Sequence, residues 1–215
     1  MILGSTRSRR PAVSPLIVAC VIVSGMGTAL LAPGKTYWTY DDYAKIPNDG
    51  KTYEIIDGEL HVSPAANRFH QDASGNFFYA LKGHCIRTGA GAVYAAPTDV
   101  SPNEKLVVQP DIFFVSKARL KLFTPDGSKF AGAPDLVIEI ISKSSVEYDM
   151  SEKKAKYEAM GVREYWPVDY KNKRVYVFVL GKNRRYGDPK VHSGDSILTT
   201  RILPGLKIRL REIWK

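Results

Sequence analysis

The sequence contains few of the residues that crosslink small domains or hold zinc. It has two cysteines, Cys20 and Cys85, and four scattered histidines. Two cysteines so far apart form neither a disulfide framework nor a metal-ligand spacing, and no two histidines lie at the separation of a zinc site. Internal repeats and low-complexity tracts are also absent. These absences exclude a disulfide-rich secreted scaffold, a zinc-binding module and a repeat protein.

The remaining composition is that of an ordinary globular domain. The chain has 215 residues, of which 44% are hydrophobic and 25% charged, enough for one domain with a substantial core. Residues 171–215 hold 12 Lys and Arg against 3 Asp and Glu, so they carry the whole net charge of +9. A basic C-terminal part suits a polyanionic partner such as nucleic acid, although a solvated basic face without a partner explains the charge equally well.

The first 34 residues form a segment separate from the predicted domain at 35–215. Three arginines precede an apolar run from Leu16 to Ala32, a pattern typical of a signal peptide or a short membrane anchor. Translation from Met26 is the alternative, and deletion of 1–25 should then leave the fold unchanged. We expect a cytoplasmic protein without a membrane partner, with export and anchoring as the competing interpretations.

From Lys35 onward the pattern is mixed α/β. In "YEIIDGELHV" two apolar runs flank Asp57-Gly58, which predicts a hairpin with a tight turn. A helix is predicted over residues 65–88, and another over 144–160 that ends at Gly161. In the strand "REYWPVD" Pro167 indicates a sheet edge or a bulge. The apolar stripe of the first helix is expected to contain Phe69, Phe77, Leu81 and Ile86.

The stretch "GAPDLVIEIISKSS" contains the least expected residue of the domain. Apolar residues occupy both alternating faces of the strand at 136–141, which indicates a strand covered on both sides. Glu139 lies in its middle, where a carboxylate costs several kcal/mol, roughly, unless it is paired or holds a metal. The sequence leaves open whether Glu139 is a metal ligand or the partner of a buried Lys or Arg.

Two further residues could complete a site with Glu139. Asp111 follows Pro110 and opens the strand "DIFFV", where it could be a metal ligand or a strand-start cap. Asp149, Lys153 and Tyr157 are spaced i, i+4 and i+8, so they share one helix face. Lys153 could therefore face the strands, or form only a surface ion pair with Asp149 worth a few tenths of a kcal/mol, roughly.

The order of these motifs resembles the PD-(D/E)XK nuclease superfamily and, more closely, its bacterial putative restriction endonuclease family. The resemblance runs from about Thr39 to about Trp214 through "YEIIDGEL", "QPDI", "GAPDLVIEI" and the spaced pattern D…K…Y…GV.EYW.VD. It implies an α/β fold, a restriction-endonuclease-like mixed β-sheet core flanked by helices. It also implies phosphodiester hydrolysis with Mg²⁺ or Mn²⁺ held by Asp111 and Glu139.

The functional lysine departs from the superfamily motif. The position two residues after Glu139 should be lysine and is Ile141. The resemblance implies that a lysine of the next helix takes its place, and Lys153 is expected to position the attacking water. Lys143 is the rival for this role.

Other expectations concern the surroundings of the site and its partners. Asp99 and His70 are expected near the site as auxiliary residues, and Arg184 and Arg185 as contacts to nucleic acid. The carboxylates that flank the hairpin turn, Glu54 and Glu59, are interpreted as surface groups, with a role for one of them in the site as the alternative. The expected partner is nucleic acid, DNA first, with a homodimer as one possible assembly and no organic cofactor. The rival function is a catalytically inactive member of the same fold that binds nucleic acid or a protein.

Overall fold

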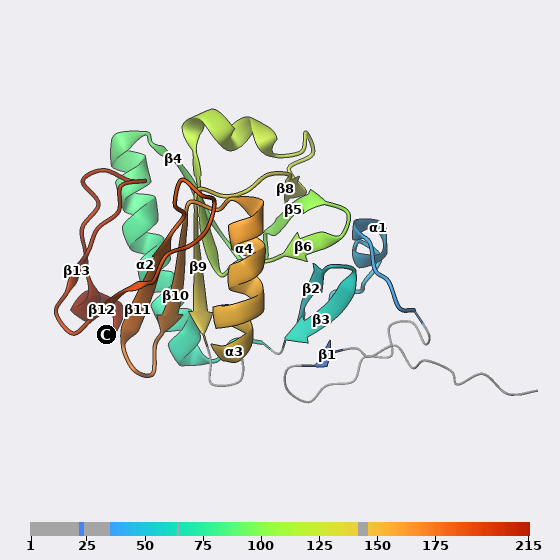
Figure 1. The fold of residues 1–215 in the computed structure, drawn as a ribbon, viewed down its shortest axis with the longest axis horizontal. Coiled ribbons are helices and arrows are strands. Elements are labelled where there is room, and N and C mark those ends of the chain that lie inside the picture. The colour runs from blue at the N-terminus through green and yellow to red at the C-terminus, as the bar shows by residue number, and fades with distance from the viewer. Residues whose placement is uncertain (1–21, 24–34, 64, 142–145) are drawn as a thin grey trace, which may run out of the picture.

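The computed structural model describes residues 22–23, 35–63, 65–141 and 146–215 (Figure 1). Apart from Ile22–Val23, the expectations for residues 1–34 lie outside these ranges, as does the rival lysine, Lys143. None of the helices in the described ranges combines the length and the apolar character that crossing a bilayer requires.

A six-stranded mixed sheet, here the central sheet, forms the middle of the domain (Figure 1). Its strands, in spatial order, are β12 (Lys190–Ser193), β11 (Arg174–Val179), β10 (Glu164–Asp169), β9 (Leu136–Ile141), β7 (Ile112–Ser116) and β4 (Gly91–Ala95). β9 and β10 are parallel, and every other neighbouring pair is antiparallel. All six residues of β9 are buried, which confirms the strand predicted to be covered on both sides.

β10 lies between β9 and β11, so the prediction that Pro167 marks an edge or a bulge is wrong. The ladder with β11 pairs Glu164 and Tyr165, skips Trp166 and Pro167, and resumes in the same register at Val168. Proline has no N–H to donate, and the interior strand tolerates it because the ladder is simply interrupted there.

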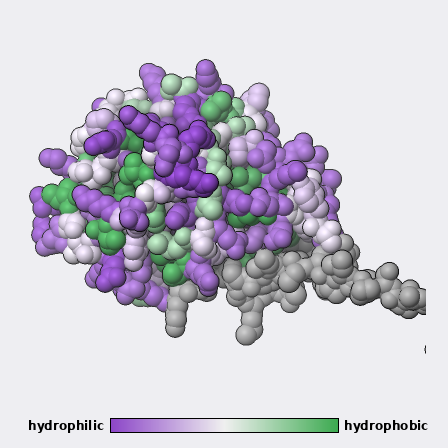
Figure 2. Space-filling view, in the orientation of Figure 1, coloured by the Kyte–Doolittle hydropathy of each residue, from purple (hydrophilic) through white to green (hydrophobic). Residues whose placement is uncertain are grey.

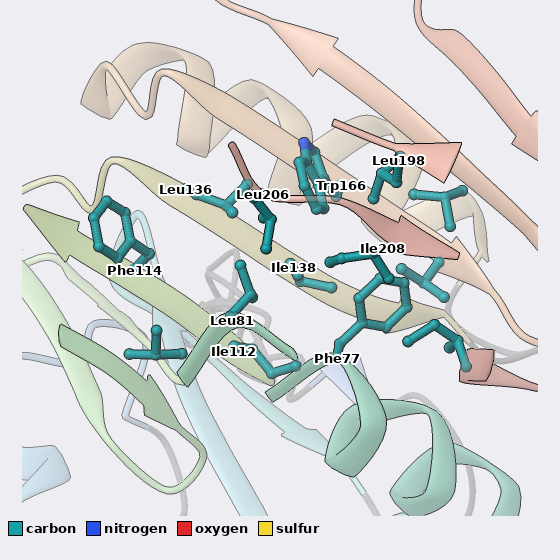
Figure 3. Packing of buried hydrophobic residues seen from close by; sticks show 14 of the residues in the cluster. Phe77, Leu81, Ile112, Phe114, Leu136, Ile138, Trp166, Leu198, Leu206 and Ile208 are labelled. Atoms are coloured by element: carbon teal, nitrogen blue, oxygen red, sulfur yellow. The ribbon is translucent and has the colours of Figure 1, made fainter. Parts of the chain in front are cut away.

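Helices cover both faces of the central sheet, as the fold prediction requires. α2 (Arg68–Thr88) packs on the face that carries Ile138, where Figure 3 shows Phe77 and Leu81 of the helix among the strand residues. The buried stripe of α2 also uses Cys85 in place of the predicted Ile86, which is 73% exposed. Phe69, in the first turn, is exposed as well, so half of the predicted stripe is wrong.

The connection from β9 to β10 covers the opposite face of the sheet, and its last helix crosses in front of β9 in Figure 1. It consists of α3 (Val146–Tyr148), one turn of π-helix, η2 (Asp149–Lys153), and α4 (Lys154–Met160). Gly161 ends it with a φ of 87°, in the left-handed region that glycine adopts readily. The predicted helix is confirmed, and the π turn lies where the predicted functional lysine is.

A second sheet, here the N-terminal sheet, lies beside the central one. Its order is β1 (Ile22–Val23), β3 (Glu59–Ser63), β2 (Thr52–Ile56), β6 (Leu106–Val108), β5 (Asp99–Asn103) and β8 (Lys129–Phe130). β1 runs parallel to β3. The predicted hairpin is confirmed, because β2 and β3 pair around Asp57 and Gly58, whose φ angles are 53° and 84°.

Short elements complete the domain. They are α1 (Tyr40–Tyr43), the 3₁₀ helix η1 (Lys117–Leu122), the pair β13 (Ile197–Leu198) and β14 (Ile208–Arg209), and α5 (Leu210–Ile213). β13, β14 and α5 add Leu198, Ile208 and Leu210, respectively, to the core beneath α2.

Candidate active site

Glu139 lies on the face of β9 that α4 covers. Its neighbours Ile138 and Ile140 point to the opposite face and join the core around α2. Glu139 itself is 4% exposed, and its Oε1 accepts a 2.6 Å hydrogen bond from the hydroxyl of Tyr157 on α4. The alternation of the strand therefore aims a buried carboxylate at the helix predicted to carry the functional lysine.

Lys153 meets that carboxylate at the end of the π turn. Its Nζ is 3.2 Å from Glu139 Oε1 and 3.0 Å from Glu54 Oε2, with Asp149 Oδ1 at 4.0 Å. The side chain of Lys153 is 9% exposed, so the alternative of a mere surface ion pair with Asp149 is wrong. Asp149, Lys153 and Tyr157 are all buried on one face of this helical segment.

Asp111 lies next to Glu139 on the neighbouring strand. β7 pairs with β9 through Ile112 and Ile138, and one further step in this antiparallel register brings Asp111 opposite Glu139. Asp111 Oδ2 accepts the backbone N–H of Ile140 at 2.7 Å. The structure thus brings together Asp111, Glu139 and Lys153.

His70 reaches this group from the first turn of α2. Its Nε2 is 3.2 Å from Asp111 Oδ2. The other ring nitrogen, Nδ1, is buried and has no hydrogen-bond partner among the described residues. His70 therefore contacts the carboxylate that was predicted to bind metal, from the side of the sheet opposite Lys153.

Glu54 is the residue that sequence reasoning missed. It is 2% exposed, so its interpretation as a surface group is wrong, whereas Glu59 is exposed as expected. Oε1 of Glu54 accepts the backbone N–H of Gln109 at 3.0 Å, and Oε2 pairs with Lys153. The signal was present, because Tyr53, Ile55 and Ile56 surround Glu54 with apolar residues as on β9.

Among the described residues, Gln109 links Asp99 to the site. Its Oδ1 accepts hydrogen bonds from the hydroxyl of Tyr43 at 2.7 Å and from Nε2 of Gln109 at 2.9 Å. Since the backbone of Gln109 in turn donates to Glu54, Asp99 supports the outer side of the site.

The protonation states of the centre are set by burial and by crowding of carboxylates. Burial, then the charges of Asp111, Asp149 and Glu54, raise the pKa of Glu139 to about 8, although the Lys153 ammonium opposes them. Burial alone would lower the pKa of Lys153, but Glu139, Glu54 and Asp149 outweigh it and raise that pKa well above its usual value. Lys153 therefore stays charged at neutral pH, while Glu139 tends to take up a proton.

The chemistry of the donor set fits a hard divalent cation. Mg²⁺ prefers oxygen ligands and is often held by one or two carboxylates, with water in its remaining positions. Asp111 and Glu139 supply two carboxylates from facing positions of neighbouring chain segments, and the charge of Asp111 is close enough to raise the pKa of Glu139. Within the described ranges, no three His, Cys, Asp or Glu side chains are grouped as a complete metal site.

Arg184 and Arg185 lie at the far end of α4 from Lys153. The guanidinium of Arg184 lies beside Gly161, which ends the helix, and Arg185 Nη1 is 2.8 Å from Glu158 Oε1. Both arginines are exposed, and Figure 2 shows hydrophilic side chains gathered over this end of the helix.

Comparison with known proteins places the chain in a family. Residues 40–211 match the model of the Uma2 family, described as "Putative restriction endonuclease". The chain belongs to this family. This membership confirms the resemblance found in the motifs, and it supports a nuclease function. No curated protein matches the sequence.

A solved structure has the same fold. It is described as a putative nuclease belonging to DUF820 from Anabaena variabilis. The likeness has a TM-score of 0.68 at 16% sequence identity, and it covers 82% of this chain and 97% of the other. At this identity the likeness shows the fold, a mixed α/β core flanked by helices as the sequence predicted.

Proposed function

We propose that this member of the restriction endonuclease family hydrolyses phosphodiester bonds of nucleic acid, with DNA as the substrate and Mg²⁺ or Mn²⁺ as the cofactor. The observation that carries the proposal is the buried Glu139–Lys153 pair beside Asp111. Buried ion pairs give little net stability, so this arrangement is better explained by chemistry than by folding.

Each residue has a role that its contacts support. Asp111 and Glu139 would hold the cation, which when bound would offset charge on the phosphoryl oxygens and acidify water. Lys153 keeps its proton, and its ammonium can orient the attacking water and steady negative charge that develops on the phosphate. His70 fixes the carboxylate of Asp111 from the α2 side.

The charge distribution supports a nucleic-acid partner. Residues 171–215 carry the whole excess of positive charge, and Arg184 and Arg185 expose two of these charges at one end of α4. We expect them to contact phosphates away from the reacting bond. A homodimer that cuts both strands in the cytoplasm, without an organic cofactor, would suit this role.

The test is cleavage by purified protein. Supercoiled plasmid, linear duplex DNA and RNA would be incubated with Mg²⁺, Mn²⁺ or EDTA, and calorimetry would measure Mn²⁺ binding. We expect metal-dependent nicking of DNA that is lost in Asp111→Asn, Glu139→Gln and Lys153→Met. The matched control, Glu59→Gln, changes an exposed carboxylate of the same hairpin as Glu54 and should cleave like the wild type.

The two main outcomes separate the proposal from its rival. Binding of nucleic acid without cleavage under any metal condition would favour the inactive binding protein. Cleavage that persists in EDTA, or in Glu139→Gln, would refute the assigned site.

A further inference from the structure

Glu54 connects the N-terminal sheet to the centre of the site. Among the residues that the structure describes, it is the only one of β2 that forms an ion pair with Lys153. Its carboxylate uses both oxygens: Oε1 accepts the N–H of Gln109, and Oε2 pairs with Lys153 at 3.0 Å. The contact to Lys153 is slightly shorter than the 3.2 Å from Lys153 to Glu139.

Glu139 and Glu54 are the two carboxylates nearest to Lys153, with Asp149 farther away at 4.0 Å, and they would have different tasks in the working site. Under the proposed function, on which this inference rests, Glu139 holds a divalent cation together with Asp111. Two positive groups then compete for Glu139, and its hold on the ammonium weakens. Glu54 remains to keep Lys153 in place, because its other oxygen, Oε1, is fixed by the N–H of Gln109.

We propose that Glu54 is a positioning residue: it anchors the Lys153 ammonium when the metal takes Glu139, and thereby sets where the lysine meets the substrate. Glu54 is not a metal ligand in this arrangement, since Oε1 already accepts the N–H of Gln109 and Oε2 is already paired with the Lys153 ammonium.

The anchor is itself held rigidly. Gln109, which donates its N–H to Glu54, also donates from Nε2 to the hydroxyl of Tyr43 at 2.7 Å and to Asp99 at 2.9 Å. Gln109 precedes Pro110 and Asp111 in sequence. The hydrogen-bond chain therefore joins the holder of the lysine to the strand that carries Asp111, so the relative positions of lysine and carboxylate are set together.

The experiment is a double-mutant cycle on Glu54 and Lys153, with and without Mn²⁺. Wild type, Glu54→Gln, Lys153→Met and the double variant would be compared in EDTA and in saturating Mn²⁺. The glutamine keeps an oxygen for the N–H of Gln109 but loses the charge that holds Lys153. Glu54→Asp keeps the charge on a shorter side chain, and Glu59→Gln is the matched control on the same hairpin.

In activity, Glu54→Gln should lower kcat about 10- to 100-fold with little change in KM, because a displaced catalytic group costs about this much. Mn²⁺ affinity, measured by calorimetry, should stay within about twofold of wild type. Glu54→Asp, which keeps the negative charge, should restore part of the loss. Glu59→Gln should behave as wild type.

Stability supplies a readout that does not depend on cleavage. In Mn²⁺, the shift of the urea midpoint caused by Glu54→Gln should largely disappear when Lys153 is already methionine. If the wild type cleaves nothing, the proposed function fails, but the stability test still applies. Non-additive shifts of the urea midpoint support the role of Glu54 as the anchor of Lys153, and additive shifts overturn it.

Other results would overturn the inference while leaving the nuclease intact. A tenfold or greater loss of Mn²⁺ affinity in Glu54→Gln, roughly, would show that Glu54 supports the metal itself and does not act through the lysine alone. A kcat of Glu54→Gln equal to that of the wild type would show that Lys153 keeps its catalytic position without Glu54.

Discussion

Replacing Glu139 by glutamine should change how the stability of the metal-free protein depends on pH. Burial and the nearby carboxylates of Asp111, Asp149 and Glu54 raise the pKa of Glu139 from 4.5 to about 8. The folded protein therefore binds this proton more tightly than the unfolded chain does. The resulting stability is complete below about pH 4.5 and is lost as the pH rises through about 8. Glutamine does not titrate, so the variant lacks this loss.

The size of the effect follows from the shift. A rise of the pKa from 4.5 to about 8 would correspond to about 5 kcal/mol if nothing relieved the buried charge. Relaxation and water penetration lessen such costs in real proteins, so we expect about 2 kcal/mol. Lys153 keeps its contact with Glu54 in the variant, so the substitution leaves no ammonium without a carboxylate.

Urea unfolding in EDTA, between about pH 5 and about pH 9, would measure the effect on wild type, Glu139→Gln and the exposed control Glu59→Gln. The unfolding free energy of Glu139→Gln should rise relative to wild type by about 2 kcal/mol across this range, because glutamine does not titrate and groups distant from Glu139 contribute equally to both proteins. The control should show no such trend. A difference that is constant, or that falls with rising pH, would refute the reasoning.

Three more outcomes can be measured on single variants. Lys153→Met should abolish cleavage while calorimetry still detects Mn²⁺ binding; loss of both would point to a collapsed site. Arg184→Ala should weaken binding to all DNA sequences alike, as measured by fluorescence anisotropy, and should reduce the slope of log affinity against log salt concentration by about 1. DNA binding that does not depend on salt concentration would refute the proposed contact of Arg184 with phosphates. Asp135→Asn should cost about 2 kcal/mol near neutral pH without changing Mn²⁺ affinity. Although burial opposes it, hydrogen bonds from Ser116 and Arg119 hold the pKa of Asp135 below 3.8, so this cost should shrink as the pH falls below that value.

The parts of the site that the sequence could predict are those with a local signal. Glu139 is recognisable because apolar residues flank it on both faces of a strand, and Lys153 because its helical spacing aligns it with Asp149 and Tyr157. Both signals depend only on neighbours in sequence. The structure confirms the burial that each signal implies.

Glu54 shows where such reasoning ends. The turn at Asp57-Gly58 dominated the pattern of its hairpin, and hairpins often expose one face to water. What buries Glu54 is a second sheet packed against the connection that carries Lys153, and the pairing of β2 with β6 that brings Gln109 to it. These contacts join segments far apart in the chain, and a single sequence carries no record of them.

The location of the charges explains why the site needs both sheets. Glu139 and Asp111 come from adjacent strands of the central sheet, Glu54 comes from the N-terminal sheet, and Lys153 lies on the π turn between them. Apolar residues of similar volume would often make such a seam more stable than a buried cluster of charges does. The region where the two sheets meet keeps charges that cost stability. An ammonium near two carboxylates is an arrangement that metal-assisted hydrolysis can use. The same cost predicts that the domain is least stable, and most responsive to a divalent cation, where its two sheets meet.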